Sequence, residues 1–383
     1  PGANSIATPL QALPSPPPPP PPSASTALLG PGAIGPGANS IATAPRRLAQ
    51  LLALSAGPMG LLRSEAELQR AAARVATASH ELVLTTVGMD AAHTQLLFLR
   101  QWVGNLRHRA ANVLLIGTDE ATCHVARNAS IPCFVDAMGG GAKAGARPKR
   151  AGPTERDETA KWFYVRALLR LGFHIVFSDA DVAWLQDPFR NWDRSFDLQG
   201  LSDIYSTNLT VGSHHKVACL DKARDRMYQL WRHIVYPCAS AHVFFLRATN
   251  AGRAFSEGMH EYMRDRPGEW GRAFQLIVMR YTVGIGDELA PLRFRLLPTS
   301  LAVNLPQYKR RQRSGLPTAA TVAVHAGQLK SEEAKVEAFR GLGFLERGLT
   351  AWQAMQAEAA VLRGARPRLA MRGGARKHRL GDQ

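Results

Sequence analysis

Two acidic residues, Asp179 and Asp181, follow a short apolar segment of the chain, His174–Ser178. The segment has the composition of a buried strand, and open α/β sheets bind ligands at the carboxyl ends of such strands. Two carboxylates so close together repel each other and resist burial unless a cation lies between them. The pattern therefore predicts a hard divalent ion, Mn²⁺ or Mg²⁺, that holds a phosphorylated substrate. A solvated turn would carry the same residue types, because Asp and Ser are common in turns.

Alternating strand and helix patterns surround these acids. The predicted strands are 82–87, 112–116, 133–135 and 174–178, and the predicted helices are 93–106, 120–127 and 158–171. This alternation predicts a largely parallel sheet with helices on both faces. The stretch is long enough for one domain with a sizeable core, which we expect to span residues 78–357.

The two ends of the chain lack the apolar side chains that a core needs. Residues 1–45 are rich in Pro, Gly and Ala and contain a proline run at 16–22, which predicts disorder. The basic tail 358–383 is predicted to be flexible for the same reason. Residues 46–77 combine two arginines with a short apolar stretch, and this pattern fits either an amphipathic helix or a degenerate membrane anchor.

Charge and cysteine content limit the partners and metal sites that the sequence predicts. The net charge is +17, and basic residues gather in the C-terminal tail and in the glycine-rich stretch 139–152. Such runs are usually solvated, although an acidic membrane surface or nucleic acid would also attract them. No aromatic residues interleave with them, so the sequence predicts no specific nucleic-acid site. The four cysteines lack the C-x-x-C spacing of a structural zinc site and leave open two disulfides or four buried thiols. Glycosylation sequons begin at Asn128 and Asn208.

The block Phe177–Phe189 resembles the nucleotide-diphospho-sugar transferase family, which includes plant and algal cell-wall glycosyltransferases of the GT-A fold. It reads Phe-Ser-Asp-Ala-Asp-Val-Ala-Trp-Leu-Gln-Asp-Pro-Phe. Further segments similar to that family are Leu82–Val87, Leu114–Glu120, Asp197–Asp203 and Thr321–Gly327, the last followed by Lys335. The resemblance covers roughly residues 80–350.

The resemblance implies a GT-A-like, Rossmann-type α/β fold and a retaining glycosyltransferase, either a hexosyl- or a pentosyltransferase. Such an enzyme would move a sugar from a nucleotide-diphosphate donor, expected to be a UDP-sugar, to a glycan or glycoprotein. It would act in the Golgi lumen or at the Golgi membrane. Any membrane association would then use an N-terminal anchor that is degenerate in, or missing from, this sequence.

The same resemblance, together with side-chain chemistry, assigns a candidate site. Asp179 and Asp181 are the predicted metal ligands, and His325 is the third, because a neutral imidazole after an apolar strand can complete the coordination. The predicted donor contacts are Thr85, Thr86, Asp119, Lys161, Asp179 and Lys335, and the predicted catalytic position is Gln275. Several of these residues also have a structural alternative. The threonines would then only fill the strand, and the histidine would form a local hydrogen bond. The aspartate would cap a helix, and the lysines would lie on the surface.

The chain departs from the family pattern at several positions. An expected Asp-Gln pair is Phe274-Gln275, a glycine is replaced around Ala241-His242, and a closing Ala-Asn is Ala326-Gly327. A catalytically degenerate protein that binds a sugar or a partner is therefore one alternative. The other is a haloacid-dehalogenase-type phosphohydrolase, whose first motif is also Asp-x-Asp and whose last acidic motif resembles Gly284–Glu288. That motif normally opens its domain, whereas here a long α/β pattern precedes it.

Overall fold

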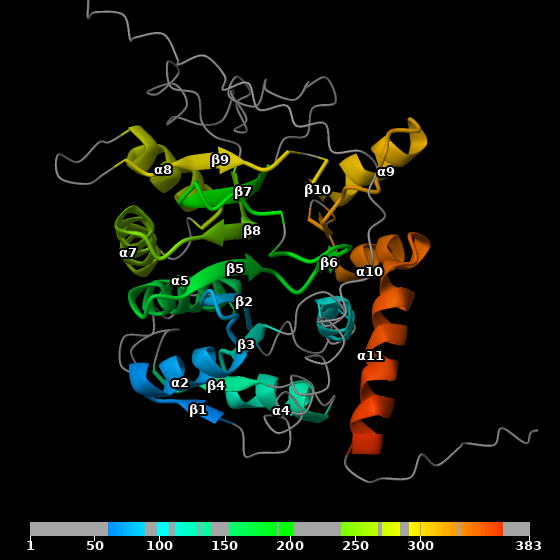
Figure 1. The fold of residues 1–383 in the computed structure, drawn as a ribbon, viewed down its shortest axis with the longest axis horizontal. Helices are drawn as coiled ribbons and strands as arrows, with labels where there is room; N and C mark the ends of the chain where they lie inside the picture. The colour runs from blue at the N-terminus through cyan, green and yellow to red at the C-terminus, as the bar shows by residue number, and fades with distance from the viewer. Residues whose placement is uncertain are drawn as a thin grey trace, which may run out of the picture. The chain divides into compact units, whose positions relative to one another are not determined.

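A computed structural model gives the fold of the chain (Figure 1). It describes residues 60–88, 98–106, 112–128, 131, 133–138, 153–189, 191–202, 239–266, 270–283, 291–298, 300–327, 329 and 331–362. The predicted disordered segment 1–45, the glycine-rich stretch 139–152, the sequon at Asn208 and the tail beyond residue 362 lie outside the described residues.

An eight-stranded sheet forms the centre of the fold, in the order β1-β4-β3-β2-β5-β8-β7-β9. Its strands are β1 (Gly60–Leu62), β2 (Glu81–Val87), β3 (Val113–Gly117), β4 (Phe134–Asp136), β5 (His174–Ser178), β7 (Leu198–Ser202), β8 (Ala239–Leu246) and β9 (Phe294–Leu296). Within this sheet only β8 runs against its neighbours, and all other pairs are parallel. The predicted largely parallel sheet is therefore confirmed.

Helices cover both faces of this sheet. They are α2 (Glu65–Val75), a helix over residues 98–106, α4 (Glu120–Asn128), α5 (Pro153–Arg170), α7 (Asn250–Asp265) and α8 (Trp270–Val283). On one face, α2, α5, α7 and α8 share an apolar cluster with Ile175 and Phe177 of β5. On the other face, the helix over 98–106 and α4 pack in a cluster with Val176. Because β5 is buried on both faces, its central residues Ile175–Phe177 are all apolar, and the predicted α/β class with helices on both faces of a largely parallel sheet is confirmed.

A second, three-stranded sheet lies beyond the carboxyl end of β5, beside the helices that end the chain (Figure 1). It contains β6 (Val182–Trp184), β10 (Ala302–Asn304) and β11 (Ala323–His325), and the helices are α9 (Leu305–Arg313), α10 (Glu332–Gly341) and α11 (Phe344–Leu362). β11 pairs antiparallel with β6 and parallel with β10. The register places His325 opposite Val182, directly after the two acids. The small sheet thus joins two parts of the chain that lie far apart in sequence.

The amino-terminal boundary of the domain differs from the sequence prediction. Residues 46–77 were expected to form a helix or an anchor outside the domain; α2 within this segment is helical, but β1 pairs with β4 and belongs to the central sheet. Gly60 permits this pairing, because a Cβ atom there would lie 2.6 Å from the Phe134 ring. Leu68 of α2 is fully buried in the core. Short strands such as β1 carry too few residues to show a period of two, which is why the pattern was missed.

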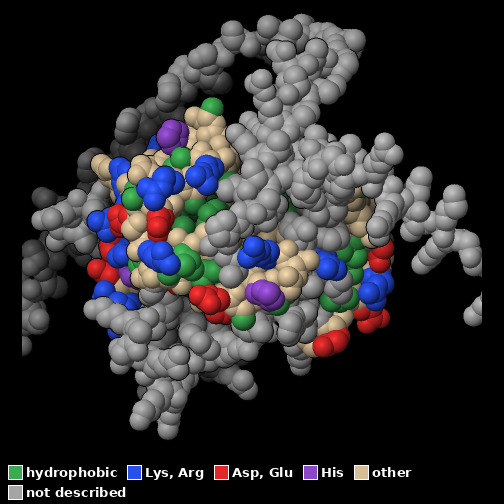
Figure 2. Space-filling model, turned by 90° about the horizontal axis from the view of Figure 1, so that it is seen from below, with side chains coloured by type: hydrophobic (Ala, Val, Ile, Leu, Met, Phe, Trp, Pro, Cys, Tyr) green, Lys and Arg blue, Asp and Glu red, His purple; other side chains and the backbone are tan. Residues whose placement is uncertain are grey.

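The part of the chain that the structure describes contains no helix with both the length and the apolar character needed to cross a membrane. Figure 2 shows one face of the molecule, on which Lys and Arg side chains are interspersed with Asp and Glu. The two basic runs found in the sequence lie outside the described residues. This face therefore offers mixed charge, not a uniformly basic surface.

The buried histidine of α7, His260, makes the stability of the fold depend on pH. Its side chain is buried against Phe163, and its Nδ1 atom has no hydrogen-bond partner among the described residues. Burial and the charge of Arg166 lower the pKa of His260 to about 4. The unfolded state, with a histidine pKa near 6.5, then binds more protons between pH 6.5 and 4. Native stability contributed by neutral His260 is therefore lost as the pH falls through this window.

We expect His260→Phe to remove this part of the pH dependence. Urea unfolding at pH 7.5 and 4.5 should show that the variant loses about 2–3 kcal/mol less free energy of unfolding than the wild type over that interval. His124→Phe, at an exposed position of α4, is the matched control and should behave as the wild type. Equal losses in the wild type and His260→Phe would contradict the prediction.

Candidate functional site

Ser178, the last residue of β5, fixes the turn that carries the acids. Its hydroxyl accepts hydrogen bonds from the indole N–H groups of Trp102 at 2.9 Å and Trp184 at 3.1 Å, and it donates to the backbone oxygen of Asp179 at 3.0 Å. All three side chains that meet here are fully buried. These hydrogen bonds fix the direction in which the chain leaves β5, and Trp184 is one of the residues that hold the turn.

Asp179 lies between an imidazole and a buried lysine. One carboxylate oxygen is 2.6 Å from Nδ1 of His242, and the other is 3.9 Å from Nζ of Lys161. The backbone N–H of Asp179 also donates to the carbonyl of His242, which ties the turn to β8. Burial alone would raise the pKa of Asp179, but the charges of Lys161 and His242 outweigh it and lower the pKa. The carboxylate is therefore held in its ionised form.

Asp181 is more deeply buried and has its own pair of partners. Its Oδ2 atom is 3.1 Å from Nζ of Lys335, and its Oδ1 atom is 3.5 Å from Nε2 of His325. Desolvation would raise the pKa of Asp181, but His325 and Lys335 outweigh that effect and lower the pKa. The sequence-predicted residues Asp179, Asp181, His325, Lys161 and Lys335 are thus brought together at one place.

The neighbours of His325 set the direction of its ring. Asn304 at the end of β10 is fully buried, and its amide Nδ2 lies 3.5 Å from the carbonyl of Ser202. Its Oδ1 atom therefore faces Nδ1 of His325, at 3.0 Å, and accepts a hydrogen bond from it. Nε2 is then the atom that faces Asp181. A metal-binding histidine gives one ring nitrogen to the ion, while the other donates a hydrogen bond that orients the ring; here Asn304 accepts that bond, and Nε2 is left for an ion.

The donor set fits a divalent cation. Ligand atoms of Asp179, His242 and His325 all lie within 4.8 Å of one another, and Asp181 is in contact with His325. Two carboxylates and two imidazoles offer the oxygen and nitrogen ligands that Mn²⁺, Co²⁺ and Zn²⁺ accept. The sequence analysis missed His242 and Asn304. The signal for His242 was present, because it falls where the family pattern has glycine, but only the fold shows that β8 lies beside β5 at this point.

Lys161 supplies a buried positive charge to the site. It lies on α5, is 1 % exposed, and contacts Glu158 at 3.2 Å. Its ammonium group also lies 4.4 Å from the centre of the Phe177 ring. A buried ammonium group is costly unless it is paired, and here one cation serves two carboxylates and an aromatic face. The surface alternative considered for this lysine is therefore wrong.

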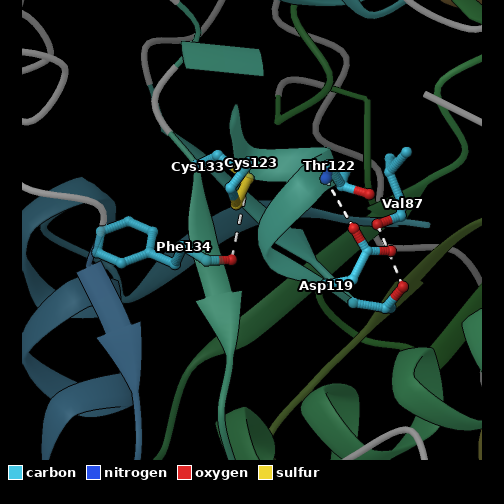
Figure 3. The surroundings of a disulfide bond; sticks show 7 residues. Val87, Asp119, Thr122, Cys123, Cys133 and Phe134 are labelled. Carbon is cyan, nitrogen blue, oxygen red and sulfur yellow. Dashed lines mark hydrogen bonds between the residues drawn. A yellow bond between two sulfur atoms is a disulfide. The ribbon is translucent and has the colours of Figure 1, made fainter. Parts of the chain in front are cut away.

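Three of the predicted donor contacts are not in this cluster. Asp119 accepts a hydrogen bond from the backbone N–H of Thr122 at 2.7 Å and so caps α4 (Figure 3). Thr85 is fully buried, and its hydroxyl makes no hydrogen bond within the described chain. Thr86, the next residue, is only partly buried. For these residues the structure supports the capping and strand-filling alternatives.

Two other predicted positions, Gln275 and Gly284–Glu288, have side chains outside the described residues. Gln275 lies on α8, but its side chain is outside the described residues. Gly284–Glu288, the segment that resembles a phosphohydrolase motif, also lies outside them. Phe274, which stands where an aspartate was expected, is buried in the core and stacks on Phe244 at 5.6 Å between ring centres.

A disulfide closes the loop after α4. Cys123 and Cys133 are bonded to each other, ten residues apart (Figure 3). Gly117 lies close beside them, because a Cβ atom there would be 2.8 Å from the Cys123 sulfur. Cys219 and Cys238 lie outside the described residues. One bridge is thus established, and the alternative of four free thiols is wrong.

Comparison with known proteins identifies a family. The nucleotide-diphospho-sugar transferase family matches residues 108–339, which is more than half of the chain. An Arabidopsis thaliana protein, UDP-D-xylose:L-fucose alpha-1,3-D-xylosyltransferase MGP4, is 27% identical over 106 residues, which cover 28% of this chain and 26% of that protein. Arabinosyltransferase RRA2 of the same plant is 35% identical over 52 residues, covering 14% of this chain and 12% of RRA2. The chain therefore matches only about a quarter or less of the length of these curated relatives.

Solved glycosyltransferases are more distant. The apo structure of the bifunctional glycosyltransferase WbbM has a TM-score of 0.42 and 10% sequence identity, covering 71% of this chain and 52% of WbbM. The galactosyltransferase LgtC, solved with donor and acceptor sugar analogues, has a TM-score of 0.37 and 13% identity, covering 68% of this chain and 95% of LgtC.

We expect Lys161→Met to destabilise the protein by about 3 kcal/mol or more, because it leaves the carboxylate of Glu158, only 13% exposed, without its cation. Urea unfolding measures this loss. Adding Glu158→Gln should recover part of it, since the uncompensated charge is then removed. Arg264→Met, which removes a cation from an exposed ion pair on α7, is the control and should leave stability nearly unchanged. A loss in Lys161→Met no larger than in that control would contradict this account of Lys161.

Proposed function

The chain belongs to the nucleotide-diphospho-sugar transferase family, and we propose that it transfers a sugar from a UDP-linked donor to a glycan or glycoprotein with the help of a divalent cation. The observation that carries this proposal is the convergence of Asp179, Asp181, His325 and Lys335 at the carboxyl end of β5. A family motif thus coincides with two carboxylates that are held in their ionised form. The same match favours a transferase over the phosphohydrolase alternative.

The reaction must stabilise a diphosphate leaving group. When bound, Mn²⁺ or Mg²⁺ would neutralise the negative charge that develops on the diphosphate as the glycosidic bond breaks. Asp179, Asp181 and His325 would hold the ion, and Asn304 would keep the His325 ring in the binding orientation. Lys335 contacts Asp181 now, and a diphosphate at the site would offer its ammonium group a second anionic partner. Gln275 remains the proposed catalytic position, by resemblance to the family, and the reaction is proposed to retain anomeric configuration.

The donor class is proposed from the relatives. The printed name of the MGP4 relative specifies UDP-D-xylose as donor, and RRA2 is an arabinosyltransferase, so pentoses are the first sugars to test. A screen that follows UDP release with Mn²⁺ across UDP-xylose, UDP-arabinose, UDP-galactose and UDP-glucose would identify the donor. Binding of UDP without release from any UDP-sugar would instead support a degenerate, sugar-binding protein.

The proposed compartment is the Golgi lumen of the secretory pathway. The Cys123–Cys133 bond supports it, because disulfides persist in oxidising compartments and are rare in the cytosol. The plant glycosyltransferase relatives support it as well. Membrane association through a segment before residue 60 remains a proposal.

We expect Asp181→Asn to slow UDP release on the order of 100-fold or more, because it removes a charged ligand and part of the charge stabilisation of the leaving group. Steady-state assays with the donor found in the screen measure the effect. Asp265→Asn, on the exposed surface of α7, makes the same chemical change away from the site and should retain wild-type rates. An Asp181→Asn variant that is as active as this control would refute the proposed site.

In protein purified from its native cells, the peptides that contain Cys123 and Cys133 should resist alkylation until a reductant is added. Mass spectrometry of alkylated digests measures this directly. Loss of the bond should lower the free energy of unfolding by about 2–3 kcal/mol, because the unfolded chain regains the entropy of an open loop. Complete alkylation of both cysteines without reductant would argue against an oxidising compartment.

A further inference from the structure

His242 is built into the cluster of acids. It lies on β8, beside the end of β5, and its Nδ1 atom is 2.6 Å from Asp179. Its ring stacks on that of His325, with 4.4 Å between ring centres and 26° between ring planes. The side chain is only partly buried, with 27% of it exposed. His242 therefore contacts two of the three residues that were assigned to the metal from the sequence.

Gly327 provides the space that the His325 ring occupies. A Cβ atom at that position would lie 2.3 Å from Cε1 and 2.6 Å from Nδ1 of His325. Any other residue there would force the His325 ring out of its present position. Two departures from the family pattern, a histidine in the region of Ala241-His242 and a glycine at 327, thus meet at His325: one stacks a second ring on it, and the other leaves room for the His325 ring.

We propose that His242 is a further protein ligand of the metal, so that the site in this chain combines two carboxylates with two imidazoles. This inference rests on the metal site of the proposed function. Ligand atoms of His242, Asp179 and His325 lie within 4.8 Å of one another, a span that one ion can bridge with small side-chain movements.

A second imidazole changes which ion the site selects. Nitrogen ligands suit Zn²⁺, Co²⁺ and other late transition ions, whereas Mg²⁺ prefers oxygen ligands and gives up its water reluctantly. The site should therefore discriminate against Mg²⁺ more strongly than one built from carboxylates and a single histidine. An ion that takes six ligands would keep positions for diphosphate oxygens, while a four-coordinate ion would be saturated by the protein.

The test is metal binding by the purified, metal-stripped chain without any donor. Affinities for Zn²⁺, Mn²⁺ and Mg²⁺ are measured by competition with a chromophoric chelator, and the visible absorption of bound Co²⁺ reports its ligands. We expect His242→Ala to weaken Zn²⁺ binding at least about tenfold. It should weaken Mn²⁺ binding less and change the Co²⁺ spectrum. Gly327→Ala should weaken all ions, because it displaces His325. The matched control is His124→Ala, an exposed histidine on α4, which should leave all three affinities and the Co²⁺ spectrum unchanged.

The outcomes separate this inference from the proposed function. If His242→Ala binds every ion as the wild type does, with an unchanged Co²⁺ spectrum, the role of His242 is overturned and the site of Asp179, Asp181 and His325 still stands. If the wild type binds no ion, both the inference and the metal-assisted form of the proposed function fail. UDP release that persists in excess chelator would contradict only the metal-assisted form of the proposed function, and the metal affinities and Co²⁺ spectrum of His242→Ala would still decide the role of His242.

Discussion

The burial of two like charges at the end of one strand is the constraint on which the rest of the site depends. β5 is covered on both faces, so the turn that follows it places Asp179 and Asp181 where desolvation disfavours ionised carboxylates. Both nevertheless have lowered pKa values, because positive and hydrogen-bonding groups from α5, β8, β11 and α10 surround them. The charge of the pair is thus balanced by residues from most of the length of the domain.

The small sheet makes this balance possible. Its β6 strand begins immediately after Asp181, and pairing with β11 fixes His325 beside that residue. The backbone N–H of Ala326 also donates to the carbonyl of Asp181, which holds the two segments in register. α10 then brings Lys335 to the same carboxylate. Backbone pairing between β6 and β11 therefore positions His325, although it lies far from Asp181 in the sequence. The contact between the two side chains does not have to hold the segments together.

Much of the fold and of the candidate site was predictable from the sequence, for reasons that differ from residue to residue. The strand before the acids was predicted because an apolar run of that length is characteristic of a buried parallel strand. His325 and Lys335 were found only through a family resemblance, since nothing local indicates that they approach Asp181. His242 was visible as a departure from the pattern, but its meaning depends on β8 lying antiparallel beside β5. Asp119 was left open between helix capping and nucleotide contact; its hydrogen bond from Thr122 supports capping, and nucleotide contact stays a prediction.

The most direct test of the account is the position of a bound ion. Crystals grown with Mn²⁺ and UDP, with data collected for anomalous scattering from manganese, would locate the metal without assumptions about its ligands. The account predicts one peak beside Asp179 and Asp181, about 2.0–2.3 Å from an imidazole nitrogen of His325, with the diphosphate of UDP on its open side. A UDP-bound crystal with no manganese peak at this place, or with the peak away from both Asp181 and His325, would contradict it.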